Sequence, residues 1–360
     1  MVPSESRHFD LACCELDSVE RLRAHLAGGR TLYEVREDGQ GGRHWQALTA
    51  DDPTPFVAQT EPPPFAAKAF FFAEREAVFR FDGERFVAIE PAAPAQVLFG
   101  LHACDLAAVA YQDQFFAADA HYQARRAATL LVGLDCRHSC SQGFCTLVDS
   151  GPEVRAGTAD LILLPSEAGW LLLIASSEAG WLLLIASVAG AAAVADLALP
   201  AASRDWPAQR VAHRQQVASE QGDGQWLQDG IAAINAAKVS AATWESLGLR
   251  CLVCSGCTTV CPTCSCFAPL ERKLPDGSIE QERVWDSCLY EGFQKEASGH
   301  NPSALAGQRV QRFWQHKFGE GFRQTFGRYG CVGCGRCDHV CPGGIGVHAV
   351  MRKVGKPCSN

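Results

Sequence analysis

The sequence predicts an α+β protein, with a mixed α/β domain in residues 1–202 and an α-helical domain in residues 203–360. Three observations lead to this prediction. In the first half, short apolar runs alternate with helical patterns. From Asp205 onward the sequence consists of polar stretches with helical periodicity. The 18 cysteines are clustered. A chain of 360 residues suits about two domains, since a domain usually holds roughly 150 residues.

Composition excludes several classes of protein. Apolar residues make up 47% and charged residues 20%, so the chain is not a disordered one. The net charge is −8 and no Lys/Arg-rich run is present, so we expect no nucleic-acid partner. The opening MVPSESRHFD lacks the pattern of an export signal. We therefore expect a cytoplasmic protein, in which a reducing environment leaves cysteines free to bind metal.

The first half predicts two helices and several short strands. A helix is expected over residues 16–28, where the pair Gly28 and Gly29 ends it, and a second over residues 106–127. The strands are expected at turn-bounded apolar runs: residues 31–37, 69–72, 77–81, 96–101 and 129–135.

A perfect tandem repeat follows, SEAGWLLLIAS at residues 166–176 and again at 177–187. Two identical copies indicate a recent duplication or a sequence error rather than a solenoid, and we assign them no function. Ser, Gly and Asp196 dilute the apolar window 179–199, so no membrane span is expected. We expect both WLLLIAS copies to form buried strands joined by SEAG as a turn, then an Ala-rich helix. One copy in the sheet with the other looped out is an open alternative.

Two runs of cysteines in the second half share the spacing C-x2-C-x2-C-x3-C-P. This is the run of bacterial ferredoxins, in which three thiolates bind one cubane and the fourth binds the other cluster. The crossing rule therefore predicts two [4Fe–4S] clusters, one held by Cys251, Cys254, Cys257 and Cys341 and the other by Cys331, Cys334, Cys337 and Cys261. Zinc is the alternative, but a zinc site has no use for a third cysteine at this spacing.

The stretch between the two runs is longer than a small ferredoxin needs. Residues 278–296 and 303–322 have a helical pattern, as do residues 205–220 and 225–248 before the first run. An α-helical dicluster ferredoxin domain therefore fits better than the compact β-hairpin type. Gly333 and Gly335 leave room for backbone N–H groups to approach cluster sulfur.

A third cysteine group lies in the first half. Cys104 and Cys136 each follow an expected strand, and the carboxyl ends of adjacent strands are where open α/β sheets place their sites. Four thiols there would hold a third [4Fe–4S] cluster: Cys104, Cys136, Cys140 and Cys145. The alternative is that these cysteines are small buried apolar residues.

The remaining cysteines carry no predicted metal role: Cys13, Cys14, Cys264, Cys266, Cys288 and Cys358. No dinucleotide-binding G-x-G-x-x-G, P-loop, HExxH or GxSxG is present, so no catalytic residue is predicted. A row of one-electron centres without a catalytic constellation is most simply an electron relay.

The motifs resemble a known family. GLDCRHSCSQGFC after HACDLAAV, then CLVCSGCTTVCPTCSCF and RYGCVGCGRCDHVCPGGIGV, resemble the beta subunit of cytoplasmic [NiFe] hydrogenases of the sulfhydrogenase type. The A subunit of anaerobic sulfite reductase is similar. Residues 68–81, KAFFFAEREAVFRF, resemble a family segment in which Pro usually stands at the position of Ala73. The likeness spans most of the chain, and the repeat at residues 166–187 departs from it.

The resemblance implies an iron–sulfur subunit that passes electrons between a flavin- and NAD(P)-binding partner and a catalytic partner. It also implies three [4Fe–4S] clusters, the third held by the N-terminal cysteines. The catalytic partner is expected to be a [NiFe] hydrogenase, and a sirohaem sulfite reductase is the alternative. Two alternative functions of a different class are a cluster-based sensor and an enzyme with its own active site beside the N-terminal cysteines.

Overall fold

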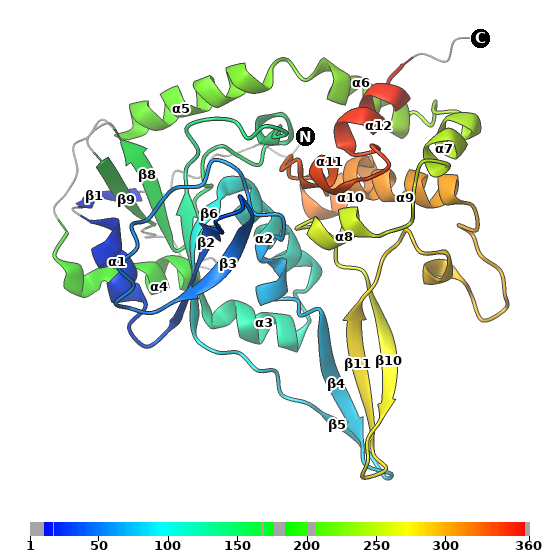
Figure 1. Ribbon diagram of the computed structural model, residues 1–360, viewed down its shortest axis with the longest axis horizontal. Coiled ribbons are helices and arrows are strands. Elements are labelled where there is room, and N and C mark those ends of the chain that lie inside the picture. Colours follow the sequence, from blue (N-terminus) through cyan, green and yellow to red (C-terminus); the bar gives the residue numbers. More distant parts are fainter. Residues whose placement is uncertain (1–10, 17, 167–168, 176–183, 200–205, 357–360) are drawn as a thin grey trace.

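A mixed sheet organises the N-terminal half of the computed structural model, which describes residues 11–16, 18–166, 169–175, 184–199 and 206–356 (Figure 1). Its seven strands are β1 (Leu11–Leu16), β2 (Thr31–Glu37), β3 (Arg43–Leu48), β6 (Gln96–His102), β7 (Thr129–Leu134), β8 (Leu161–Ser166) and β9 (Gly169–Ala175). They are ordered β1-β9-β8-β7-β6-β2-β3. The central four, β8, β7, β6 and β2, run parallel, and the outer pairings are antiparallel.

Helices cover both faces of this sheet, which is why its central strands are continuous apolar runs. On one face, alternate residues such as Val97 and Val132 pack against α1 (Val19–Leu26) and α4 (Leu184–Val194). On the other face, residues such as Leu98 and Leu131 pack against α2 (Ala103–Phe115) and α3 (Ala120–Ala127). The predicted helix 106–127 is thus two helices, because Asp119 caps the second by accepting from the N–H of Tyr122 at 2.8 Å.

Two short apolar segments were assigned wrongly from the sequence. The expected strand 69–72 is instead the 3₁₀ turn η1 (Ala67–Phe70), followed by the fully buried Phe71 and Phe72. In the repeat, the first WLLLIAS copy forms β9, but the described end of the second copy begins α4. The expected turn at residues 177–180 lies outside the described residues. Periodicity does not separate strand from helix in apolar runs this short.

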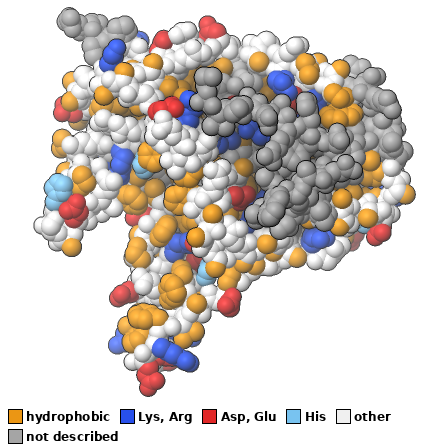
Figure 2. All heavy atoms as spheres, turned by 180° about the vertical axis from the view of Figure 1, so that it is seen from behind, with side chains coloured by type: hydrophobic (Ala, Val, Ile, Leu, Met, Phe, Trp, Pro, Cys, Tyr) orange, Lys and Arg blue, Asp and Glu red, His pale blue; other side chains and the backbone are white. Residues whose placement is uncertain are grey.

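A second sheet joins sequence from both halves of the chain. It is antiparallel, in the order β10-β11-β4-β5, and projects from the body as an arm (Figures 1 and 2). Its strands are β4 (Arg75–Phe81), β5 (Phe86–Ala88), β10 (Phe267–Lys273) and β11 (Ile279–Trp285). The helix predicted over residues 278–296 is therefore wrong: β11 and the 3₁₀ turn η4 (Glu291–Gln294) lie there. Cross-strand ion pairs stabilise β11, since Glu280 pairs with Arg80 and Arg272.

The rest of the second half is helical. Its helices are α5 (Trp206–Gln221), α6 (Gln225–Asn235), α7 (Ala241–Gly248), α8 (Gly256–Val260), α9 (Ala306–Phe318), α10 (Glu320–Phe326), α11 (Arg336–Val340) and α12 (Val347–Val354). Phe313, Trp314, Phe318 and Met351 form the centre of their apolar core. The predicted helix 225–248 is interrupted before Ser240, whose side chain caps α7. None of the described helices combines the length and apolar character needed to cross a membrane.

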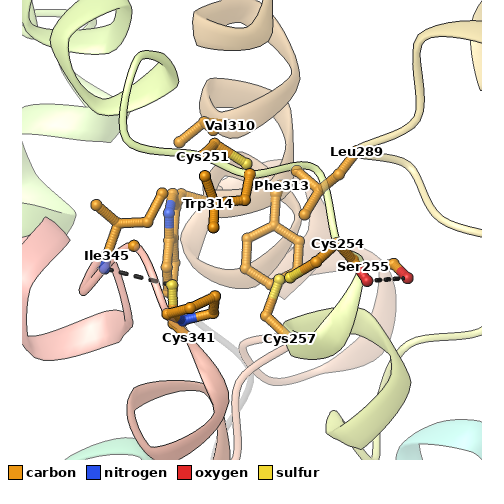
Figure 3. A pocket seen from close by; sticks show the side chains of 13 residues that line it. Cys251, Cys254, Ser255, Cys257, Leu289, Val310, Phe313, Trp314, Cys341 and Ile345 are labelled. Carbon is orange, nitrogen blue, oxygen red and sulfur yellow. Dashed lines mark hydrogen bonds between the residues drawn. The ribbon is translucent and has the colours of Figure 1, made fainter.

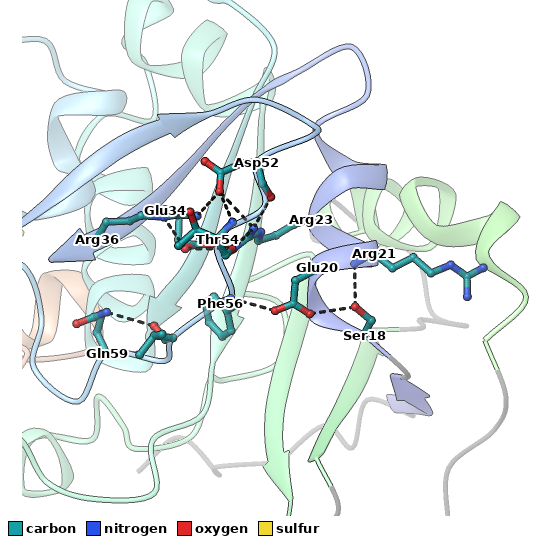
Figure 4. A network of polar contacts seen from close by, with 11 residues as sticks. Ser18, Glu20, Arg21, Arg23, Glu34, Arg36, Asp52, Thr54, Phe56 and Gln59 are labelled. Carbon is teal, nitrogen blue, oxygen red and sulfur yellow. Dashed lines mark hydrogen bonds and ion pairs between the residues drawn. The ribbon is translucent and has the colours of Figure 1, made fainter.

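The irregular segment after β3 is held against α1 and β2 by polar contacts (Figure 4). The buried Arg23 guanidinium donates to Glu34 at 3.2 Å and to the carbonyl of Thr54 at 2.7 Å. Further along, the carbonyl of Gln59 lies 2.8 Å from His102 Nε2. These contacts fix the path of residues 49–63, which end beside the cysteine groups.

Candidate metal centres

The two cysteine runs adopt the same local structure. In each run the third cysteine lies in the first turn of a short helix, α8 or α11, and the fourth, Cys261 or Cys341, directly follows that helix. The two helices contact each other, and Gly256 of α8 lies against Val340 of α11. This arrangement brings the fourth cysteine of each run toward the other run.

The first run surrounds a cavity together with the fourth cysteine of the second run (Figure 3). We name this group the cavity site, formed by Cys251, Cys254, Cys257 and Cys341. The side chains that line the cavity beside them are mostly apolar: Leu252, Leu289, Val310, Phe313, Trp314 and Ile345. Burial, together with the charges of Cys251 and Cys341, raises the pKa of the Cys257 thiol to about 12. Cys254 is the exposed member of the group.

The second run approaches the fourth cysteine of the first. We name this group the central site, formed by Cys331, Cys334, Cys337 and Cys261. Burial raises the pKa of Cys331 to about 12, and Cys334 and Cys261 lie close enough to add to the rise. Cys261 differs, because a hydrogen bond from the Cys264 thiol lowers its pKa although burial opposes this. In the structure, the fourth cysteine of each run thus lies near the first three cysteines of the other run.

The N-terminal cysteines gather at the carboxyl ends of β6 and β7. These strands are parallel neighbours; Cys104 begins α2 after β6, and Cys136 follows β7. Cys140 and Cys145 come from the loop that follows. Burial raises the pKa of Cys140 to about 12, with Cys145 among the charges that add to it. We name the four the N-terminal site.

Polar side chains far away in the sequence hold the loop around Cys140. Glu220 of α5 accepts from the N–H of Ser139 at 2.6 Å, and Glu61 accepts from the N–H of Ser141 at 2.6 Å. Gln221 donates to the Cys145 sulfur at 3.4 Å. The hydrogen bond from Ser139, together with those from Gln216 and His138, lowers the pKa of Glu220 to about 2. No motif marks these residues, so their role could not be predicted from the sequence.

The N-terminal and central sites adjoin each other. The N–H of Phe144 donates to the carbonyl of Gly333 at 2.8 Å. A Cβ at Gly333 would lie 2.7 Å from Cys145, so only glycine permits this approach. Charge from Cys334 of the central site acts on both Cys104 and Cys145. Cys334 is therefore the member of the central site that lies close to the N-terminal site.

A buried ion pair fastens the same junction. Arg336 of α11 donates to both carboxylate oxygens of Asp105 in α2, at 2.7 and 2.8 Å. Its Nε donates to the carbonyl of Pro63 at 2.8 Å. Both charged side chains are almost completely buried. Asp105, which neighbours Cys104 in sequence, therefore positions α11 and is not free to bind metal.

The loops differ in how they achieve the same backbone path. Gly333 and Gly335 have φ of 66° and 71°, and the corresponding residues of the first run, Val253 and Ser255, have φ of 53° and 58°. In this conformation the N–H of Gly333 donates to the sulfur of Cys331 at 3.4 Å. The expected approach of backbone N–H groups to sulfur is therefore present, directed at a cysteine thiol.

All twelve donors of the three sites are cysteine sulfurs, the ligand type that iron–sulfur clusters use. Among the described residues, no three His, Cys, Asp or Glu side chains converge on a single metal position. A cubane does not require that convergence, because each thiolate binds a different iron. The donor set fits [4Fe–4S] clusters.

The other cysteines of the central region form contacts among themselves. The thiol and N–H of Cys288 donate to Cys266 and lower its pKa to about 6. Cys264 is buried against Cys261. Cys358 lies outside the described residues, as does the side chain of Cys13.

Comparison with known proteins agrees with this geometry. Residues 250–345 match the family of 4Fe-4S dicluster domains. The chain is 26% identical over 281 residues to sulfhydrogenase 2 subunit beta of Pyrococcus furiosus, a match that covers 77% of this chain and 79% of the relative. No solved structure matches the chain. The resemblance drawn from the cysteine motifs is thus confirmed: the chain is an iron–sulfur protein similar to a hydrogenase beta subunit.

Proposed function

We propose that the protein is the electron-transfer subunit of an oxidoreductase complex. It relays electrons between a flavin- and NAD(P)-binding subunit and a catalytic subunit, which we propose to be a cytoplasmic [NiFe] hydrogenase. The observation that carries this proposal is the proximity of three all-cysteine groups: Cys261 of the central site acts on Cys257 of the cavity site, and Cys334 of the central site packs near the N-terminal cysteines. The name of the Pyrococcus relative supports the hydrogenase assignment.

The ligand assignment is part of the proposal. The cavity site and the central site each take three thiolates from one run and the fourth from the other, and the N-terminal site supplies the third set. Each bound [4Fe–4S] cluster would accept and release one electron. The count of three clusters is supported by the grouping of Cys104, Cys136, Cys140 and Cys145 at adjacent strand ends.

The chain's own residues prepare the sites for this role. Apolar side chains such as Phe313 and Trp314 line the cavity site. Backbone N–H groups donate to thiol sulfur, from Gly333 to Cys331 and from Ile345 to Cys341, each at 3.4 Å. Such bonds stabilise thiolate charge and tune reduction potential.

Anaerobic affinity purification of the tagged chain from its native cell tests the proposal. We expect three [4Fe–4S] clusters per chain by iron and sulfide analysis, with a flavoprotein and a nickel-containing subunit recovered together. A sirohaem subunit instead would assign the chain to an anaerobic sulfite reductase. A chain recovered alone that turns over hydrogen, sulfite or NADPH would contradict the relay.

The ligand assignment has its own test. The Cys257→Ser variant should lose the cluster of the cavity site, because a required thiolate is missing. Cys14→Ser is the matched control, since Cys14 in β1 belongs to none of the three groups. Unchanged iron and sulfide content in Cys257→Ser would contradict the assignment.

A further inference from the structure

Two lysines lie in the protein interior beside the central site. Lys68 of η1 and Lys317 of α9 are 5% and 6% exposed. The Lys68 ammonium donates to the carbonyls of Thr258 and Cys264 at 2.9 and 3.3 Å, and Lys317 donates to Thr263 Oγ1 at 2.9 Å. All these contacts are with neutral groups, so they do not balance the buried charges.

Neither lysine has a carboxylate within ion-pair distance in the described part of the chain. Among the described residues, four of the five buried arginines do have one, and Arg309 is the exception. Their pairs are Arg23–Glu34, Arg210–Asp135, Arg283–Glu76 and Arg336–Asp105. A buried cation without a counter-charge is strongly unfavourable, so Lys68 and Lys317 require negative charge from another source.

The cysteines that act on both lysines are Cys261 of the central site and its buried neighbour Cys264. Burial lowers the pKa of Lys317, but Cys261 and Cys264 raise it, with smaller contributions from Tyr111 and Cys331, and the net shift is upward. Burial also lowers the pKa of Lys68, which the same two cysteines partly oppose. Four thiolates around a [4Fe–4S] cluster carry net negative charge, and reduction adds one more. Such a cluster would balance the two lysines.

The other two sites have less buried positive charge without a counter-charge. At the N-terminal site, Arg336 is neutralised by Asp105. At the cavity site, Arg309 acts on Cys251 and, like the lysines, donates only to neutral groups, so this site has one such cation where the central site has two. Arg328 acts on both Cys331 and Cys104, so it does not distinguish the central site from the N-terminal site.

We propose that Lys68 and Lys317 are fixed internal cations that raise the reduction potential of the central cluster, so that it is the first of the three to be reduced. The inference rests on the proposed function, because it requires a cluster at this site. The physical reason is that a nearby cation stabilises the added negative charge, and it does so strongly where water is excluded. A single electron taken up by the protein would then reside on the central cluster.

Redox titration of the full chain, followed by electron paramagnetic resonance, tests the proposal. In Lys317→Met we expect the first-reduced signal to become harder to reduce by at least tenfold in equilibrium constant, which is about 59 mV for one electron. The other signals should keep their potentials. Lys317→Arg keeps the charge and should titrate as wild type does. Lys295→Met removes an exposed lysine and is the matched control.

Unchanged potentials in both Lys317→Met and Lys68→Met, at wild-type iron content, would overturn the inference and leave the relay standing. Absence of iron from the purified wild-type chain would overturn both this inference and the proposed electron-transfer function.

Assignment of the first-reduced signal is a second test that needs no lysine variant. Cys334→Ser should alter this signal, and Cys254→Ser, which changes the cavity site, should not. The reverse pattern would show that the central cluster is not reduced first and would overturn the inference.

Discussion

At the scale of single residues, Val253 occupies a backbone conformation that glycine takes in the second run. A left-handed conformation costs a residue with a side chain about 1–2 kcal/mol. Glycine removes this cost but adds freedom to the unfolded chain, worth about 0.4–1 kcal/mol. We therefore expect Val253→Gly to raise the free energy of unfolding by about 0.5 kcal/mol. Anaerobic chemical denaturation of the cluster-containing chain measures it.

The neighbouring valine of the other run is the control. Val332 is 2% exposed and packs beside Cys104, and its φ is not positive. Val332→Gly should destabilise the chain by about 2 kcal/mol or more through lost burial. Equal destabilisation of the two variants would contradict the argument from backbone strain.

Asp160 predicts a pH dependence of stability. Its carboxylate accepts from the N–H of Leu131 at 2.7 Å, and burial raises its pKa to about 6. The folded state therefore binds a proton more tightly than the unfolded state, whose carboxyl titrates near pH 4. The protonated Asp160 therefore stabilises the folded chain below about pH 4. This contribution, about 3 kcal/mol, is lost as the pH rises to about 6.

Urea denaturation at pH 4.5 and pH 7 checks this contribution. Asp160→Asn keeps an oxygen acceptor for the Leu131 N–H but does not titrate, so its stability should change less between the two pH values than that of wild type. A wild-type difference that persists unchanged in Asp160→Asn would assign the effect to other groups.

At the scale of elements, the strands next to the sites could be predicted from sequence. The apolar runs that became β6 and β7 are buried on both faces, and turn residues bound them. The helix expected at residues 278–296 failed because β11 is stabilised by partners distant in sequence. Glu282 pairs with Arg75 across the sheet, a contact that no local pattern contains.

The ion pair between α2 and α11 predicts a strong effect of one substitution. Asp105→Asn leaves Arg336 buried without a counter-charge, which costs about 3–5 kcal/mol. We expect a lower melting temperature and loss of iron, because the pair holds the N-terminal and central sites together. The double variant Asp105→Leu with Arg336→Met removes both charges and should recover most of the stability.

An exposed pair supplies the control. Glu320 and Arg323 lie 3.3 Å apart on α10 with about half of each side chain exposed. Glu320→Gln should therefore cost less than about 1 kcal/mol. If the double variant at Asp105 and Arg336 is as unstable as Asp105→Asn, the uncompensated charge is not the cause.

At the scale of the whole molecule, the sequence shows the cysteine groups proposed as metal donors but not their surroundings. Cysteine spacing carries the ferredoxin pattern, so the two runs could be found directly. Glu61, Glu220 and Lys317 are common residue types in unremarkable local sequence, and their roles arise only from contacts with residues distant in the chain. Burial and missing counter-charge are properties of the folded chain, which is why no motif predicts them.

The junction of the two halves predicts how the whole chain responds to metal removal. The shared sheet pairs β4 with β11, and the N-terminal site adjoins the central site across the junction, where Phe144 donates to Gly333. Without clusters, Lys68 and Lys317 lose the negative charge that balances them, at a cost comparable to the roughly 3–5 kcal/mol of a broken buried pair. We expect anaerobic chelation of iron to lower the melting temperature by more than about 5 °C in one transition. Calorimetry that resolves two transitions, with one unaffected by chelation, would show that the N-terminal half folds independently of the clusters.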